Sequence, residues 1–191
     1  MPIRLVTFDV LHTIVTPRLP IYVQYSLVFE PYLGSLEPDV IKKSFKIALK
    51  QLQAEQPVYK GGANAWWADV VRRTALGAGA DCHAVDRHIG EIVPRLMKRF
   101  SSKKGYKLYD DTLPCLEQLK SLNVRTAVIS NTDVRMRSVL EDLEVAPLMH
   151  PMLLSEEEGV EKPSREIYRR ACDIAGARLE DTVHVGDDLQ A

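Results

Sequence analysis

The sequence predicts an α/β protein whose doubly wound, Rossmann-like parallel sheet is interrupted after its first strand by an all-helical domain. Three observations predict this fold class. They are an apolar strand close to the N-terminus, a long stretch with helical periodicity and no comparable strand, and a regular alternation of helix and strand in the rest of the chain. Parallel strands need crossover connections, which are usually helices, so the alternation favours a parallel sheet.

The first strand is expected over residues 3–10, which read I-R-L-V-T-F-D-V. β-Branched and aromatic residues fill most of this segment, as is typical of a strand that is buried on both faces of a sheet. Asp9 therefore stands at the carboxyl end of the first strand.

Residues 17–104 carry helical patterns. In residues 39–54, apolar side chains recur near helical spacing, and we expect further helices over 63–76 and 84–100. Glycine and proline mark breaks between them. The segment is therefore predicted to be an all-helical insert.

The pattern changes after a polar, basic joint at residues 101–105. The expected elements are a helix over 111–122, a strand over 125–130, a helix over 134–143, an apolar segment over 149–154, a helix over 164–175 and a strand over 182–185. We therefore expect a sheet domain made of residues 1–16 and 105–191, and a helical domain made of residues 17–104.

The composition is that of an ordinary water-soluble protein. The 191 residues are 46% hydrophobic and 27% charged, with a formal net charge of −1 and basic residues spread along the chain. This charge balance argues against nucleic acid or an anionic membrane as a partner. The N-terminal apolar run is too short for a signal peptide or a membrane span, so we expect a cytoplasmic protein. The oligomeric state is left open.

The three cysteines do not form a recognisable pattern. Cys82, Cys115 and Cys172 are widely separated and odd in number, so neither a CxxC metal site nor a disulfide framework is indicated. We expect them to be reduced, buried and small packing residues.

Chemically useful residues follow the strands. Ligands of doubly wound sheets bind beyond the carboxyl ends of the strands, where this chain carries Asp9, Ser130 with Asn131, and Asp187 with Asp188. Lys162 precedes a proline at the expected start of a helix in the same half of the chain. An acid, a hydroxyl, a cation and an acidic pair are therefore expected to converge on one edge.

This set of residues favours phosphoryl transfer. A carboxylate can attack phosphorus only if the repulsion between two anions is neutralised, which Lys162 and a divalent ion would do for Asp9. Ser130 and Asn131 would donate hydrogen bonds to phosphoryl oxygens. Phosphoryl transfer is therefore the chemistry that these residues favour.

The same edge offers ligands for Mg²⁺. Asp9, Asp187 and Asp188 supply the hard carboxylate oxygens that this ion prefers, and a backbone carbonyl near Asp9 could add another.

In order along the chain, four segments resemble the motifs of the haloacid dehalogenase superfamily. They are F-D-V-L-H-T at 8–13, I-S-N-T at 129–132, E-K-P at 161–163 and H-V-G-D-D at 184–188. The resemblance spans nearly the whole chain and implies a Rossmann-like core with Asp9 as nucleophile. It also implies that the insert is a C1-type cap that closes over the site and helps to select substrate.

One departure from the family pattern concerns proton transfer. Family phosphatases usually carry a second aspartate two residues after the nucleophile, where this chain has Leu11. The Leu11 carbonyl could still bind Mg²⁺, but its side chain cannot move a proton, and the nearest substitute is His12. General acid–base help contributes about 10² to 10⁴ in rate, so weak turnover is expected.

The other departure is at the C-terminus. Family members continue beyond the position of Asp188 with another acid, a helix and at least one strand, whereas three residues follow Asp188 here. We therefore expect a core that is truncated at its C-terminal end, with the strand at 182–185 at the edge of the sheet.

Three functions follow as alternatives. The first is a phosphatase-like hydrolase that acts on a small phosphorylated metabolite through an aspartyl-phosphate intermediate. The second is a metal-independent 2-haloacid dehalogenase, in which halide leaves carbon without a proton and Leu11 is no handicap, although the Asp187–Asp188 pair argues weakly against it. The third is a catalytically inactive relative that acts as a binding or regulatory protein.

Overall fold

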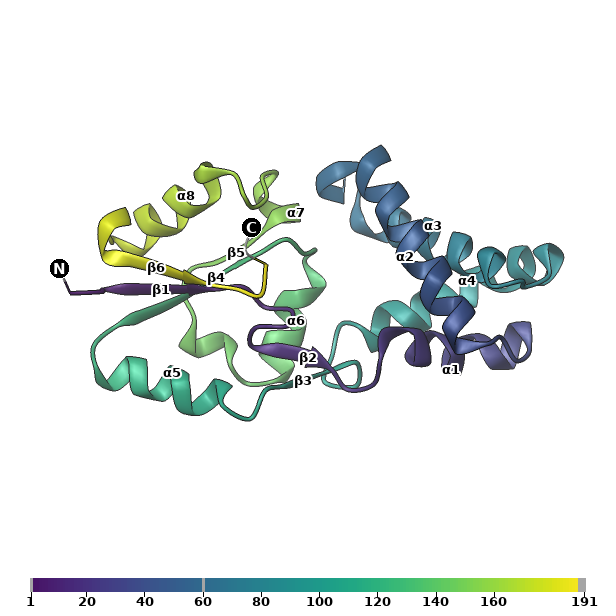
Figure 1. Ribbon diagram of the computed structural model, residues 1–191, viewed down its shortest axis with the longest axis horizontal. Helices are drawn as coiled ribbons and strands as arrows, with labels where there is room; N and C mark the ends of the chain where they lie inside the picture. The colour runs from purple at the N-terminus through teal and green to yellow at the C-terminus, as the bar shows by residue number, and fades with distance from the viewer. Residues whose placement is uncertain (1, 60, 189–191) are drawn as a thin grey trace. The chain divides into compact units, whose positions relative to one another are not determined.

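The computed structural model describes residues 2–59 and 61–188 (Figure 1). The chain forms two compact units, one made of the residues up to Thr16 and from Tyr106 onward, the other of Pro17–Gly105. Gly105, which we expected in the first unit, lies in the second. Each unit is described by itself below.

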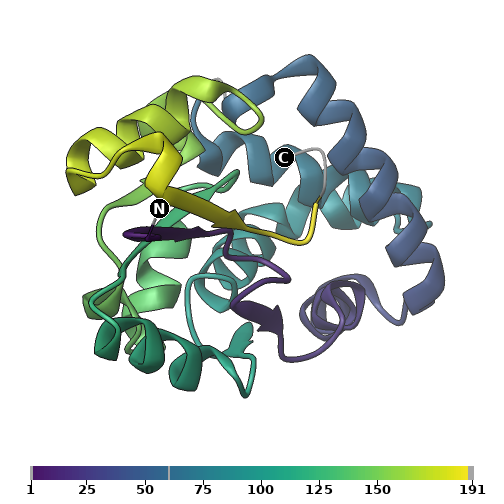
Figure 2. The ribbon, with the colours of Figure 1, turned by 60° about the vertical axis from the view of Figure 1, so that its left-hand side comes forward.

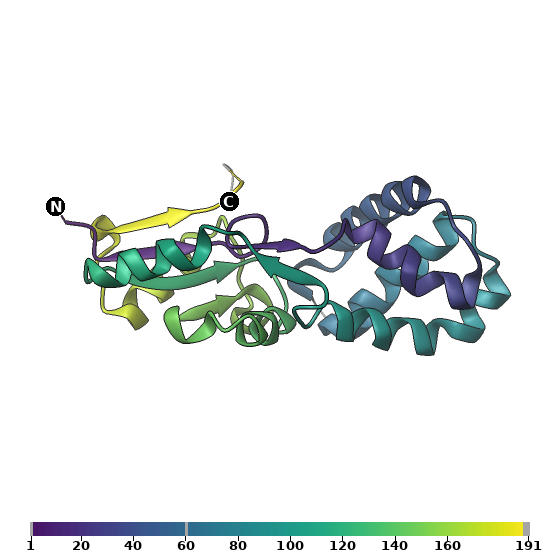
Figure 3. The ribbon, with the colours of Figure 1, turned by 90° about the horizontal axis from the view of Figure 1, so that it is seen from below.

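The first unit is built on a four-stranded parallel sheet. Its strands are β1 (Leu5–Phe8), β4 (Arg125–Ser130), β5 (Met152–Leu154) and β6 (Thr182–Val185), in the order β5-β4-β1-β6 (Figure 3). The predicted parallel sheet is confirmed, and β4 and β6 have the predicted bounds. β6 forms one edge of the described sheet, beside β1 (Figure 2).

The register of the strands brings their carboxyl ends to one level. Phe8 pairs with Val128 on one side and with Val185 on the other. The residues that follow, Asp9 after β1 and Ser130 at the end of β4, therefore reach the same edge. Sequence position alone predicted this convergence, because parallel strands share one direction.

Helices cover both faces of this sheet. They are α5 (Thr112–Ser121), α6 (Arg135–Asp142), α7 (Ser155–Glu158) and α8 (Arg165–Ala175), with single 3₁₀ turns at Ala146–Leu148 and Leu179–Asp181. Figure 1 shows α8 on one face and α5 and α6 on the other.

The core of the unit lies between α8 and the strands. Leu5 of β1 and Ala127 of β4 pack against Cys172 and Ala175, while Ile167 and Ala171 join the buried cluster around Ile129 and Leu153. The buried positions of α8 recur at helical spacing, so one stripe of the helix faces the sheet. Ser164 caps its first turn by accepting the Glu166 N–H, and Gly176 ends it in the left-handed conformation that favours glycine.

Two short strands were not predicted. β2 (Val15–Pro17) and β3 (Tyr106–Leu108) form a separate two-stranded sheet at the two ends of the insert. Each has three residues and one of them contains a proline, so neither shows the alternation by which strands are recognised. The pairing of β2 with β3 brings the two ends of the insert together.

The second unit consists of α1 (Ile21–Leu33), α2 (Pro38–Glu55), α3 (Ala63–Gly77) and α4 (Cys82–Arg99), with a 3₁₀ turn at Pro57–Tyr59. The all-helical character is confirmed within the described residues. Helix α1 was missed because its apolar residues do not form one stripe and it contains Pro31. Tyr25 and Phe29 of this helix are buried, and Tyr25 also packs edge-on against Phe45 of α2 at a centroid distance of 5.3 Å.

The burial of two cysteines differs from expectation. Cys82 and Cys115 are exposed and only Cys172 is buried, because the first two fall on outward faces of α4 and α5.

Within the described part of the chain, no helix combines the length and apolar character needed to cross a membrane.

Candidate functional site

Asp9 is held at the carboxyl end of β1 by contacts to its backbone and to both carboxylate oxygens. Its N–H donates to the Val185 carbonyl at 2.8 Å, which ties it to the end of β6. Oδ1 accepts hydrogen bonds from the Val10 N–H at 2.7 Å and from the Ser130 hydroxyl at 2.8 Å. Oδ2 lies 2.8 Å from the Lys162 ammonium. Three expected site residues, Asp9, Ser130 and Lys162, are therefore in direct contact.

Lys162 is almost entirely withdrawn from solvent. Its side chain is 1% exposed, whereas 15% of the Asp9 side chain is exposed. A buried ammonium is costly unless a charge and hydrogen bonds compensate it, and Asp9 provides the charge. The lysine comes from the segment between α7 and α8, so the ion pair joins two distant parts of the chain.

Asn131 contacts the backbone of this lysine. Its Nδ2 donates to the Lys162 carbonyl at 2.9 Å, and its Oδ1 accepts the Lys162 N–H at 2.8 Å. Sequence reasoning placed Asn131 on the phosphoryl group, which stays a prediction. The double contact with Lys162 was not foreseen.

The loop after Asp9 turns back on the carbonyl of Val10, which accepts the N–H groups of Thr13, Ile14 and Val15 at 2.9–3.3 Å. His12 adopts a φ of 62° within this turn. Among the described hydrogen bonds, none uses the carbonyl of Leu11. The role of this carbonyl as a metal ligand stays a prediction.

His12 is exposed, and no contact with Asp9 is found among the described residues. The left-handed backbone at His12 turns the chain at this residue. The structure therefore gives no support to His12 as a substitute for the missing second aspartate.

The acidic pair Asp187–Asp188 follows β6 and is exposed. The backbone just before it runs beside Asp9, because a Cβ placed on Gly186 would lie 3.6 Å from the Asp9 Cβ. In the residues that the structure describes, no three His, Cys, Asp or Glu side chains are gathered as a metal-binding group. The donor types nevertheless suit Mg²⁺, since carboxylates and the Leu11 carbonyl are hard oxygen ligands.

A histidine that sequence reasoning did not use lies below this edge. His184 of β6 pairs with Thr7 of β1 in the strand register, and its Nδ1 lies 2.9 Å from the Thr7 hydroxyl. The Tyr168 ring stands edge-on to the imidazole at a centroid distance of 5.2 Å. Only the strand register reveals the Thr7 contact.

Burial and charge shift the titration of these rings. Burial lowers the pKa of His184, the positive charge of Lys162 lowers it further, and the Asp9 carboxylate opposes them. Burial raises the pKa of Tyr168, and the Asp9 charge adds to that effect. His184 is therefore favoured in its neutral form.

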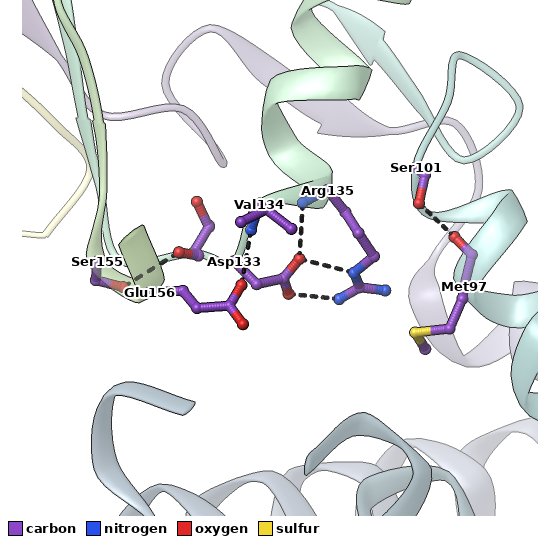
Figure 4. Close-up of polar contacts among 8 residues, drawn as sticks. Met97, Ser101, Asp133, Val134, Arg135, Ser155 and Glu156 are labelled. Carbon is purple, nitrogen blue, oxygen red and sulfur yellow. Dashed lines mark hydrogen bonds and ion pairs between the residues drawn. The ribbon is translucent and has the colours of Figure 1, made fainter. Parts of the chain in front are cut away.

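The loop between β4 and α6 is fixed by its own ion pair (Figure 4). Asp133 is buried, and its Oδ2 lies 2.6 Å from Nη2 of Arg135. The N–H of Val134 donates to Glu156 Oε2 at 3.0 Å. These contacts hold the chain that follows Ser130, the last residue of β4, and Asn131.

Residues 156–158 are three consecutive glutamates, a composition that is more typical of a solvated loop than of a packed element. Instead they lie in α7, and each carboxylate has a partner: Glu156 caps α6, Glu157 pairs with Arg137 and Glu158 pairs with Arg170. Three adjacent acids are stabilised here because a different donor contacts each of them.

Similarity to known proteins extends over nearly the whole chain. A model of the family described as haloacid dehalogenase-like hydrolase matches residues 3–190. The chain is 29% identical over 195 residues to haloacid dehalogenase-like hydrolase domain-containing protein 3 of Bos taurus, covering 100% of this chain and 76% of that one. It is 31% identical over 199 residues to an uncharacterized hydrolase of Schizosaccharomyces pombe, covering 98% and 83% of the two chains.

Solved structures agree in fold. The hydrolase YfnB of Bacillus subtilis, solved with bound magnesium, aligns with a TM-score of 0.73 at 20% identity, over 100% of this chain and 82% of that one. A solved dehalogenase aligns with a TM-score of 0.71 at 17% identity, over 98% and 78% of the two chains. With the family match and the contacts among Asp9, Ser130 and Lys162, these findings lead to one conclusion: the chain belongs to the haloacid dehalogenase-like hydrolases.

Proposed function

We propose that this hydrolase is phosphatase-like and cleaves a small phosphorylated metabolite through an aspartyl-phosphate on Asp9. The observation that carries the proposal is the Asp9 carboxylate held between the Ser130 hydroxyl and the buried Lys162 ammonium. A carboxylate in this setting is fixed in orientation and has a cation beside it. Both are needed for attack on an anionic phosphoryl group.

The reaction has two stages. An oxygen of Asp9 attacks phosphorus, and the bond to the leaving alcohol oxygen breaks with its electron pair staying on that oxygen. Lys162 offsets the negative charge of the transferred group, and Ser130 donates a hydrogen bond to one of its oxygens. Water then releases inorganic phosphate and restores the Asp9 carboxylate.

Mg²⁺ belongs to this proposal as charge neutralisation for the phosphoryl group. The Asp9 carboxylate, the Leu11 carbonyl and the carboxylates of Asp187 and Asp188 are the groups that would hold it. Two observations support this set: no hydrogen bond to the Leu11 carbonyl is found among the described residues, and Gly186 passes beside Asp9.

Leu11 limits the rate in this mechanism. It occupies the position from which an acid would protonate the leaving alcohol and then activate water, and its side chain does neither. Substrates with good leaving groups, which depart without a proton, are therefore expected to react best.

The test is a panel of small phosphoesters assayed for phosphate release with and without Mg²⁺. Asp9→Asn keeps the size of the side chain and removes the nucleophile, and Asp173→Asn, at an exposed position of α8, is the matched control. We expect release that needs Mg²⁺, is lost in Asp9→Asn and is retained in Asp173→Asn. Equal release by Asp9→Asn would remove Asp9 from the mechanism.

A 2-haloacid dehalogenase is the second candidate, and Leu11 is the observation that favours it. Halide leaves carbon without a proton, so the missing acid costs this reaction nothing at the first step. Solved dehalogenases are among the similar structures, although their identity of about 17% supports the fold alone. Halide release from 2-chloropropionate that persists in EDTA would establish this activity instead.

A binding or regulatory role without catalysis is the remaining outcome. It would follow if neither substrate class turns over and if Mg²⁺ with beryllium fluoride leaves the melting temperature unchanged. A ligand of the folded state adds about 2.7 kcal/mol of stability at a hundredfold excess over its Kd.

A further inference from the structure

We infer that Asn131 is a positioning residue that keeps Lys162 against Asp9 by holding the lysine backbone. The inference deepens the proposed function, on which its catalytic part rests. In this role Asn131 acts on catalysis by fixing the position of Lys162 and not by contacting the substrate.

The geometry of the contact carries this inference. One side chain satisfies both backbone groups of Lys162, with Nδ2 donating to the carbonyl at 2.9 Å and Oδ1 accepting the N–H at 2.8 Å. Two hydrogen bonds of opposite direction fix a residue in position and in rotation, as the rungs of a β-ladder do. No other backbone partner of Lys162 is found in the described part of the chain.

The location of Lys162 explains why such a hold is needed. The lysine lies in the connection between α7 and α8, outside regular secondary structure, and has no ladder to fix it. Its side chain is nevertheless 1% exposed and ends 2.8 Å from Asp9. A buried cation at the end of a long, flexible side chain stays in one place only if its backbone does.

One strand end therefore controls both partners of the ion pair. Ser130, the last residue of β4, donates to Asp9, and the next residue holds Lys162. The braced loop that begins with Asp133 follows directly. A shift of this strand end would therefore move both Ser130, which donates a hydrogen bond to Asp9, and Lys162, which forms the ion pair with Asp9.

The test measures the accessibility of Lys162 by its reaction with trinitrobenzenesulfonate, followed peptide by peptide by mass spectrometry. In the unaltered chain, Lys162 is expected to react far more slowly than exposed lysines such as Lys107. In Asn131→Ala, loss of both hydrogen bonds is expected to raise its labelling rate by about tenfold or more. Asn64→Ala, at an exposed position of α3, is the control and should leave the rate unchanged.

Cys172 distinguishes local release from general loosening. It is buried in α8 against the sheet, whereas Cys82 and Cys115 are exposed and are expected to react with thiol reagents in the folded protein. Faster labelling of Lys162 with Cys172 still protected supports the inference. Unchanged labelling of Lys162, or parallel exposure of Lys162 and Cys172, overturns it.

A second variant and an activity cycle complete the test. Asn131→Asp keeps the oxygen that accepts the Lys162 N–H and loses the donor to its carbonyl, so a smaller rise in labelling is expected if the alanine variant does not fold. In a Lys162→Ala background, Asn131→Ala should lower phosphate release no further, because its effect passes through the lysine. A further fall would show direct substrate contact. If no phosphoester is cleaved at all, the labelling result still decides the positioning role.

Discussion

Lys162 and Asp9 form an ion pair that is open to solvent on one side only. The Nζ–Oδ2 distance is 2.8 Å, and the exposed fraction is 1% for the lysine side chain against 15% for the aspartate. A ligand can therefore approach the carboxylate without displacing the ammonium. The asymmetry has consequences for stability as well as for chemistry.

Asp9→Asn is expected to destabilise the protein. The substitution leaves the buried Lys162 charge without its counter-ion, and the free energy of unfolding should fall by about 3 kcal/mol, as for other broken buried pairs. Urea denaturation measures the change. The double variant Asp9→Asn with Lys162→Met should regain much of the lost stability, because it has no buried charge to compensate. An Asp9→Asn protein as stable as the original would contradict the view that Lys162 is buried and needs Asp9 as its counter-ion.

Ser130→Ala should affect catalysis more than folding. The hydroxyl is one of two donors to Asp9 Oδ1, and the Val10 N–H remains. We expect kcat/KM for phosphate release to fall by about 10² and the unfolding free energy by about 1 kcal/mol. Ser138→Ala, at an exposed position of α6, is the matched control. A fall in stability without a fall in rate would make Ser130 a purely structural residue.

Leu11→Asp separates the two enzymatic candidates. If the chain is a phosphatase, a carboxylate at this position restores proton transfer and should raise phosphate release by up to about 10². Leu11→Asn has similar size and polarity but no proton to give, so it should not raise the rate. Increased halide release, or no change in either activity with Leu11→Asp, would count against the proton-transfer explanation of weak turnover.

The pH dependence of stability should contain a contribution from His184. Burial and Lys162 hold its pKa below the ordinary value of 6.5, so the unfolded chain binds the proton more readily. The contribution of His184 to the free energy of unfolding is therefore fully present above about pH 6.5. It is lost as the pH falls through the lowered pKa of the folded state.

Melting temperatures between about pH 8 and pH 5 test this sign. His184→Gln should show a shallower decline over that range, because the variant lacks the ring that takes up the proton. His83→Gln, at an exposed position of α4, is the control. A steeper decline in His184→Gln would mean that the ring gains its proton more readily in the folded state.

The sheet could be predicted because its strands carry local signals. The segments 125–130 and 182–185 are short runs rich in β-branched residues, and they fold with the predicted bounds. β2 and β3 could not be predicted, since three-residue strands are stabilised by each other more than by their own side chains. Helix α1 lacks the single apolar stripe that marked α2.

In the candidate site, too, some features could be predicted from local sequence and others could not. Asp9, Ser130 and Lys162 were predicted because they stand at strand and helix ends, and topology brings such ends together. The contact between Thr7 and His184 depends on the register of β1 against β6, which no local pattern encodes. Asn131 was recognised as a site residue, but its backbone contact with Lys162 requires the path of a loop.

The pairing of β2 with β3 bears on how such a protein can diversify. The Arg18 N–H donates to the Gly105 carbonyl at 2.9 Å, so the two ends of an 89-residue excursion, Pro17–Gly105, meet at a single hydrogen-bonded ribbon. Insertions, deletions or wholesale replacement between those ends leave the spacing of the ribbon unaltered. The helical unit can therefore vary in length and sequence while the contacts of Asp9 with Ser130 and Lys162 are retained.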